Sequence, residues 1–148
     1  MPDVNIHVIS ASGKNKSLYR GGIALGVIRP GTILKEVPGG FTLNDTLPTV
    51  FGEQLIVADQ DRQRSKSIME DWTIDENMVA ILPRSGEFIN IRVEQGSSLE
   101  RGSPMSRNDS VSGVLKLAMT DGSEEIVGYS DVTRPDLAFE MPIRIRVA

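Results

Sequence analysis

The sequence has no cysteine and a single histidine, His7, among its 148 residues. Disulfides, thiolate nucleophiles and cysteine-ligated zinc or iron sites are therefore excluded. Asp3 is the carboxylate closest to His7 in the sequence, and no further ligands follow at a spacing typical of a metal site. We therefore expect His7 to be a surface residue of a strand, and we expect no metal to be bound.

Long apolar runs are also missing. No run approaches the roughly 18 to 20 residues of a membrane helix, and residues 1–5 have neither the basic nor the apolar region of a signal peptide. The formal net charge is -4, and the two signs are interspersed along the chain, which does not favour binding to nucleic-acid phosphates. We expect a protein that is made in the cytoplasm and binds neither membranes nor nucleic acids.

Motifs of enzymes are incomplete. No serine lies in the strained glycine turn that marks a hydrolase nucleophile. The glycines at 21–26 precede a strand and a proline turn, whereas a phosphate-binding loop precedes a helix. The signature of the trimeric dUTP pyrophosphatases is echoed at residues 26–28, but Arg29 stands where the catalytic acid belongs. We therefore expect no enzymatic activity, no catalytic residues and no cofactor.

Short apolar and β-branched runs separated by turn-forming residues dominate the chain, which has 14 glycines, 8 prolines and 5% aromatic residues. A single helical turn is expected at residues 67–72, where Ile68 and Trp72 are four apart. The pattern predicts an all-β fold, a compact β-barrel or β-sandwich of short antiparallel strands with an extended N-terminal arm and little helix. The clearest strand candidates are residues 23–28, 32–34, 41–43, 54–58, 77–82, 88–93, 112–117, 125–130 and 143–147.

Two polar stretches stand apart from the strand candidates. Residues 10–17 are polar and follow an alternating segment with Val4, Ile6 and Val8 on one face, so residues 1–20 are interpreted as an N-terminal arm. Residues 59–66 include five charged side chains and no large apolar one. This second stretch predicts an exposed loop whose acids are solvated.

A weak repeat divides the remainder of the chain. The segment that begins at Gly40 is echoed at Gly113, and the segment that begins at Glu53 is echoed at Glu124. Each half places glycine turns and strands in the same order. We expect one β domain over residues 21–148, and the echo suggests two pseudo-repeats, residues 21–82 and 83–148.

Most of the chain resembles one family of structural proteins. The runs at 81–93, 94–105, 112–117 and 125–132 resemble the second half of tailed-bacteriophage head decoration proteins, also called capsid cement proteins. The first half fits the same order, with Arg-Pro-Gly-Thr-Ile-Leu at 29–34, Ile-Met-Glu-Asp-Trp at 68–72 and Met-Val-Ala-Ile-Leu-Pro at 78–83.

The resemblance implies a structural virion protein that binds the outer surface of a phage capsid and cements the lattice of the major capsid protein. It implies a homotrimer made in the host cytoplasm. In that setting the arm is expected to bind the capsid by adding Val4, Ile6 and Val8 as a strand to the capsid protein or to a neighbouring copy.

Two other classes of protein share part of the pattern. A tail or baseplate β-domain has the same all-β character. A lipoyl or biotinyl carrier module has a similar glycine spacing and would be modified at Lys116, but Leu-Lys-Leu at 115–117 lacks the Met-Lys or Asp-Lys hairpin tip of those carriers.

Overall fold

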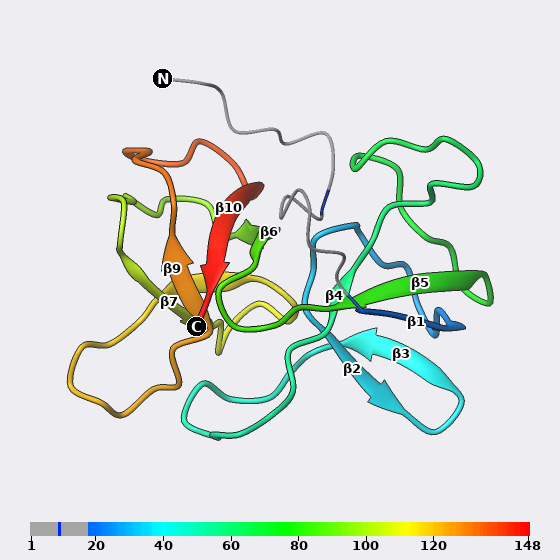
Figure 1. Cartoon of the computed structure of the whole chain (residues 1–148), viewed down its shortest axis with the longest axis horizontal. Helices are drawn as coiled ribbons and strands as arrows, with labels where there is room; N and C mark the ends of the chain where they lie inside the picture. The colour runs from blue at the N-terminus through cyan, green and yellow to red at the C-terminus, as the bar shows by residue number, and fades with distance from the viewer. Residues whose placement is uncertain (1–8, 10–17) are drawn as a thin grey trace.

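The structure of the protein, a computed structural model, describes residue 9 and residues 18–148 (Figure 1). This part of the chain contains strands and turns but no helix, and so no helix that could span a membrane. The all-β prediction is confirmed. The strands are β1 Leu18–Ile23, β2 Leu34–Val37, β3 Gly40–Leu43, β4 Val57–Ala58, β5 Asn77–Leu82, β6 Phe88–Val93, β7 Pro104–Arg107, β8 Leu115–Leu117, β9 Gly128–Ser130 and β10 Met141–Val147.

The ten strands form two sets that lie side by side (Figure 1). Strands β6 to β10 close into a barrel in the order β10-β6-β8-β7-β9. Strands β1 to β5 form a three-stranded sheet in the order β1-β5-β4 and a separate β2-β3 hairpin. All ladders are antiparallel except the single β6–β8 pair, Val93 with Leu115. The barrel and the short antiparallel strands agree with the predicted fold class.

The second set repeats the pairing scheme of the first. β1 and β4 both pair with β5, as β6 and β9 both pair with β10, and β2 pairs with β3 as β7 pairs with β8. Two pairings of the barrel remain, β6 with β8 and β7 with β9. Their counterparts in the first set are single bridges, Ala24 with Phe41 and Ile33 with Val57. Duplication of one unit would produce such a repeated pairing scheme. The division into repeats at 21–82 and 83–148 stays a prediction.

The hydrophobic core crosses the boundary between the two sets. Barrel residues such as Ile89 and Met105 share one cluster with Ile33, Val57 and Ile81 of the first set. A smaller cluster around Phe41 and Trp72 lies within the first set. The two sets therefore bury each other's apolar surface and cannot be separated without exposing it to water.

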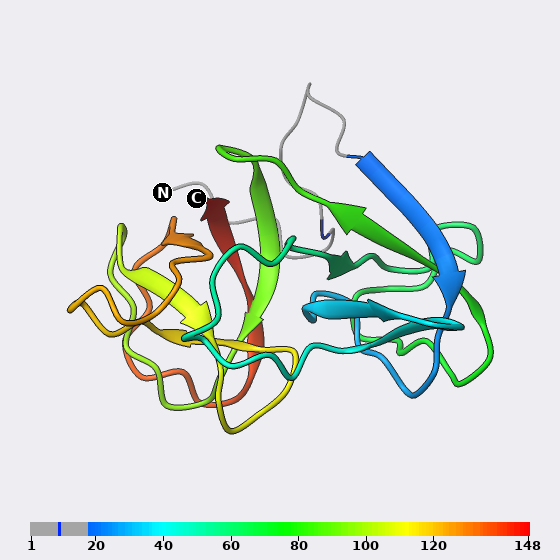
Figure 2. The ribbon, with the colours of Figure 1, turned by 90° about the horizontal axis from the view of Figure 1, so that it is seen from below.

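Strand β6 lies against β10 in the middle of the molecule (Figure 2). Its sequence alternates, as expected of a half-buried strand, but Asn90 and Arg92 are as buried as their apolar neighbours. Arg92 Nε donates to Pro30 O over 2.8 Å, and Arg92 Nη2 donates to Ile68 O over 3.1 Å. The polar face of β6 is thus covered by turns of the first set.

The structure describes residues 9 and 18–20 of the segment interpreted as an N-terminal arm. Strand β1 begins at Leu18, so residues 18–20 belong to the sheet. Ile9 is fully buried in the barrel core, where its carbonyl accepts a hydrogen bond from Asn90 N over 2.8 Å. Residue 9 is therefore an anchor point on the body of the protein, and Val4, Ile6, His7 and Val8 lie outside the described residues.

The loop at residues 59–66 is anchored at its start, contrary to the prediction. Asp59 and Asp61 are buried, while residues 62–65 are exposed. Asp59 Oδ2 accepts a hydrogen bond from Arg62 Nε over 3.1 Å, and the Trp72 indole donates to Asp59 O over 2.7 Å. The prediction of solvated acids is wrong here because backbone and side-chain donors satisfy these carboxylates inside the fold.

At residues 67–72, where a helical turn is expected, the chain forms a turn and no helix. Glu70 N donates to Ser67 O over 3.1 Å, and Glu70 Oε1 accepts from Ser67 N over 3.2 Å. The first bond closes a turn of the backbone, and the second ties the Glu70 side chain back to the start of that turn. Trp72 then leaves the turn to bridge with Ile28.

Candidate docking surface

The residues proposed from the sequence are not brought together in the described structure. Val4, Ile6 and Val8, the proposed capsid-binding residues, lie outside the described part of the chain. Lys116 lies in the middle strand position of β8 and forms a 2.7 Å ion pair with Glu124. A strand residue held in this way is not at a hairpin tip, where carrier modules present their lysine.

A different feature stands out, the loop of residues 44–53 between β3 and β4. It exposes three large apolar side chains, Leu47 at 55%, Val50 at 48% and Phe51 at 58% of their surface. Scattered exposed apolar residues are ordinary, but a group of them on one loop marks a surface for interaction. We call the loop the docking loop.

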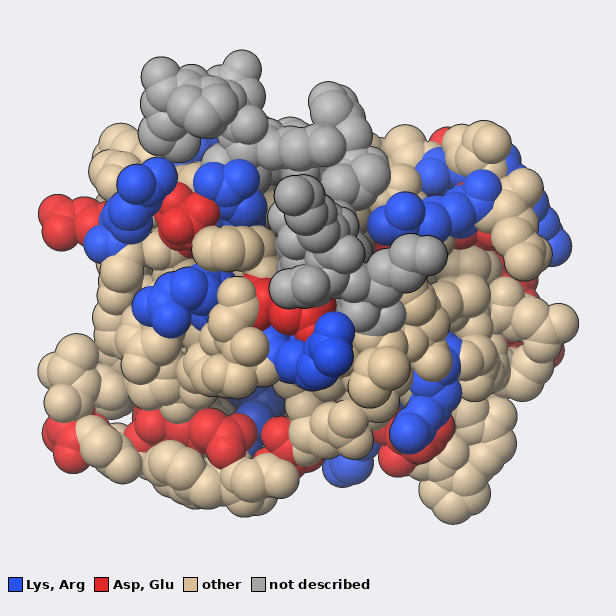
Figure 3. Space-filling model, in the orientation of Figure 1, with Lys and Arg blue, Asp and Glu red and all other residues tan. Residues whose placement is uncertain are grey.

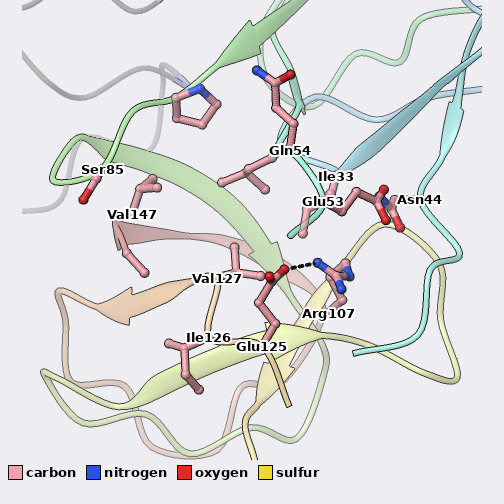
Figure 4. A pocket seen from close by; sticks show the side chains of 13 residues that line it. Ile33, Asn44, Glu53, Gln54, Ser85, Arg107, Glu125, Ile126, Val127 and Val147 are labelled. Carbon is pink, nitrogen blue, oxygen red and sulfur yellow. Dashed lines mark hydrogen bonds and ion pairs between the residues drawn. The ribbon is translucent and has the colours of Figure 1, made fainter. Parts of the chain in front are cut away.

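The docking loop is held from behind by Arg107, a residue of β7 whose side chain is 7% exposed. Its guanidinium donates to three loop carbonyls, Thr46 O over 3.4 Å, Leu47 O over 3.1 Å and Val50 O. Arg107 Nη1 also donates to Glu125 Oε1 over 2.7 Å, as Figure 4 shows. Because the planar guanidinium presents five donors in a fixed fork, one side chain can fix several turns of the loop backbone.

Glu125 and Asn44 complete this support. Glu125 Oε2 accepts from Gly52 N over 2.5 Å, and Glu125 N donates to Pro48 O over 2.8 Å. At the start of the loop, Asn44 Nδ2 donates to Glu53 Oε1 over 2.6 Å. Backbone groups of Thr46, Leu47, Pro48, Val50 and Gly52 are therefore bonded to Arg107 and Glu125, while the side chains of Leu47, Val50 and Phe51 stay exposed.

A cavity of about 250 Å³ lies behind the docking loop, between the two sets of strands (Figure 4). It is lined by apolar side chains such as Ile33 and Val127, together with Arg107 and Glu125, which bond to each other. In residue 9 and residues 18–148, no group of three or more His, Cys, Asp or Glu side chains is placed to hold a metal ion. The charged groups of the cavity support the loop.

The chain in and beside the docking loop is acidic. The docking loop and the neighbouring segment 117–127 contain acids but no Lys or Arg, and Figure 3 shows a row of acidic side chains along this lower edge. Hydrogen bonds from Ser123 Oγ and Ser123 N lower the pKa of Asp121 below its ordinary value. The acids of the docking loop and of segment 117–127 are Asp45, Glu53, Asp121, Glu124 and Glu125.

Glu124 is buried beneath this acidic edge. Burial by itself raises the pKa of Glu124, but hydrogen bonds from Lys116 Nζ and Met119 N outweigh it and hold the pKa below its ordinary value. The ion pair of Glu124 with Lys116 therefore fixes the β8–β9 loop against β8.

Sequence reasoning did not identify the docking loop. Its local signal is three large apolar residues, one just before Pro48 and two between Pro48 and Gly52, that follow no strand or helix period. Arg107 lies far from the loop in the sequence, so its role there has no local signal. Searches for related proteins found no family model and no curated protein that match the chain.

Proposed function

We propose that the protein is a decoration protein of a bacteriophage capsid, which binds the outer surface of the head and cements neighbouring copies of the major capsid protein. The observation that carries the proposal is the docking loop, in which a buried Arg107 holds the backbone while Leu47, Val50 and Phe51 remain exposed. The sequence resemblance to head decoration proteins supplies the identity of the partner.

A rigid surface suits this work. Binding costs free energy when a loop must be ordered on contact, and a loop that is already bonded to the body avoids much of that cost. A protein that binds across two capsid subunits adds its interface free energy to what is required to separate them. The pressure of packaged DNA would then have to overcome both the contacts between the capsid subunits and the added interface with this protein.

The homotrimer, the virion location and the N-terminal arm remain parts of the same proposal. The arm, with Val4, Ile6 and Val8, would add as a strand to the capsid protein or to a neighbouring copy. Because Ile9 is in the core, the arm is tested by removing residues 2–8 and keeping Ile9. Loss of head binding without loss of thermal stability supports the arm, and unchanged binding contradicts it.

The direct test is co-sedimentation of the purified protein with expanded empty heads of its phage. Wild-type protein and the Phe51→Ser variant are compared, with Phe139→Ser as a matched control because Phe139 is 61% exposed on the β9–β10 loop. We expect Phe51→Ser to weaken binding to heads at least about tenfold, as for a central apolar anchor, while Phe139→Ser binds as wild type.

Two outcomes favour the other classes of protein. Binding to isolated tails in place of heads would support a tail or baseplate β-domain. A mass increase at Lys116 in protein purified from its host would support a carrier module, against the ion pair that now holds this lysine. Absence of binding to heads by the wild-type protein would contradict the capsid proposal.

A further inference from the structure

We infer that the docking loop takes a partner surface on which an apolar depression is bordered by Lys or Arg side chains. The inference rests on the proposed function for the identity of the partner, but its chemistry comes from the loop itself. It begins with the uneven charge of this end of the molecule, where the docking loop and segment 117–127 contain acids and no bases.

Some of these acids are neutralised by basic residues that reach them from the strands. Glu125 is paired with Arg107 and Glu124 with Lys116, each at 2.7 Å, so these four charges cancel inside the fold. Asp45 lies 3.4 Å from Lys35, an exposed pair that attracts weakly.

Glu53 and Asp121 have neutral donors and so keep their full charge. Glu53 accepts a hydrogen bond from Asn44 Nδ2, and Asp121 accepts from Ser123 N over 3.0 Å and Ser123 Oγ over 2.5 Å. Hydrogen bonds from neutral groups stabilise a carboxylate without cancelling its field at a distance. Glu53 ends the docking loop, and Asp121 lies in the neighbouring β8–β9 loop.

The apolar tip and the two uncancelled acids belong to two neighbouring loops at one end of the molecule. Glu125 N donates to Pro48 O, so the β8–β9 loop is fixed directly beside the docking loop. Complementary potentials steer two surfaces together and raise the association rate, and the apolar tip supplies contact area once they meet. A partner with acidic residues around its depression would be repelled.

The first experiment uses two synthetic peptides of equal length, one alternating Lys and Leu and one alternating Glu and Leu, as probes. Amide chemical shifts of the full-length protein are recorded during titration with each. We expect the Lys peptide to shift amides of residues 45–53 and 118–125 and the Glu peptide to leave them unchanged. Equal shifts with both peptides, or shifts confined to other residues, would overturn the inference.

The second experiment neutralises the uncancelled acids with the double variant Glu53→Gln, Asp121→Asn, whose amide oxygens can still accept from Asn44 Nδ2 and from Ser123. Its matched control is Glu100→Gln, Asp136→Asn, which removes two exposed acids from the β6–β7 and β9–β10 loops. We expect the first variant to bind the Lys peptide at least about threefold more weakly at low salt and the control to bind as wild type. Equal affinity of wild type and the first variant would overturn the inference.

Measurements of binding to phage heads distinguish failure of this inference from failure of the proposed function. If heads are bound with an affinity that neither salt nor the double variant changes, the capsid role stands and the basic partner is wrong. If the Lys peptide binds the docking loop as described but heads are not bound, the chemistry of the surface stands and the capsid role fails.

Discussion

Arg107 replaces water around three backbone carbonyls with its own donors, and this determines what the docking loop can expose. A loop of this length would ordinarily bury its apolar side chains against the body and leave its carbonyls in water. Here the carbonyls of Thr46, Leu47 and Val50 point inward to a guanidinium, so the side chains of Leu47 and Val50 remain outside.

Substituting Arg107→Met should destabilise the protein by about 3 kcal/mol, because Glu125 would then be left without its partner beside three unsatisfied carbonyls. Arg107→Lys should keep the ion pair but lose most of the carbonyl contacts, since an ammonium lacks the planar fork. Urea unfolding measures the stability, and hydrogen exchange of residues 45–53 measures the loosening of the loop. The control Arg20→Met breaks the exposed pair of Arg20 with Glu36, both side chains being 45% exposed, and should cost under about 1 kcal/mol; equal losses for both positions would contradict the role of Arg107.

Asp59 gives the protein a pH dependence of known sign. Burial raises the pKa of Asp59 above its ordinary value of 3.8, and the nearby Arg62 offsets this in part. The folded protein therefore holds a proton that the unfolded chain releases first, so the contribution of Asp59 to stability falls as pH rises from about 3.8 through the folded pKa.

The Asp59→Asn variant should remove this loss of stability with rising pH. Its stability relative to wild type should increase as pH rises through that range and then level off, as measured by urea midpoints between pH 3 and 7. The exposed Asp136→Asn serves as a control for the removal of one carboxylate. A flat difference for Asp59→Asn would show that burial does not set the pKa of this carboxylate.

Among the elements, the strands were predictable where apolar pattern alone determines them. The bounds of β5 and β6 match the predicted runs, because both consist of continuous or alternating apolar residues between turn formers. β4 is shorter than its predicted run, residues 54–58, because residues 54–56 complete the connection from the docking loop. The predicted run at 23–28 contributes isolated bridges at Ala24 and Ile28, a tertiary arrangement that no local pattern specifies.

The β9–β10 pairing depends on the absence of a side chain at Gly128. A Cβ atom there would lie 2.5 Å from Ile145 Cγ2 and 2.6 Å from Arg146 O. Gly128→Ala should therefore destabilise the protein by about 2 to 3 kcal/mol through overpacking. Gly26→Ala, where no heavy atom lies within 4 Å, should change stability by less than about 0.5 kcal/mol; thermal unfolding of the two variants compares them, and similar losses would contradict the close approach of β9 and β10.

For the whole molecule, the sequence predicted one β domain with two pseudo-repeats, but not which residues of one repeat pack against the other. The echo of glycine turns follows from local patterns, whereas contacts of Ile33 and Ile81 with the barrel depend on how the halves dock. The same limit applies to the docking surface, since its loop and its supporting strand β7 come from different halves. Contacts between segments far apart in the chain leave no periodic pattern in the sequence from which they could be predicted.

The shared core predicts that both halves unfold together. The methyl signals of Met78 in the first set and Met105 in the barrel are matched probes, because both side chains are buried. Their urea midpoints should coincide, as in a two-state transition. Met69, 71% exposed, is an internal reference whose signal should move little. Midpoints that differ by more than about 0.5 M would show that the halves unfold separately.

The barrel order also bears on how the chain folds during synthesis. β10 is the last described strand to leave the ribosome, and it pairs with both β6 and β9, so the ring closes only when residues 141–147 have emerged. Until then the edges of β6 and β9 offer unpaired backbone groups to any neighbouring nascent chain. Slowing translation shortly before β10 would prolong that exposure, and we expect it to increase aggregation of the nascent chain.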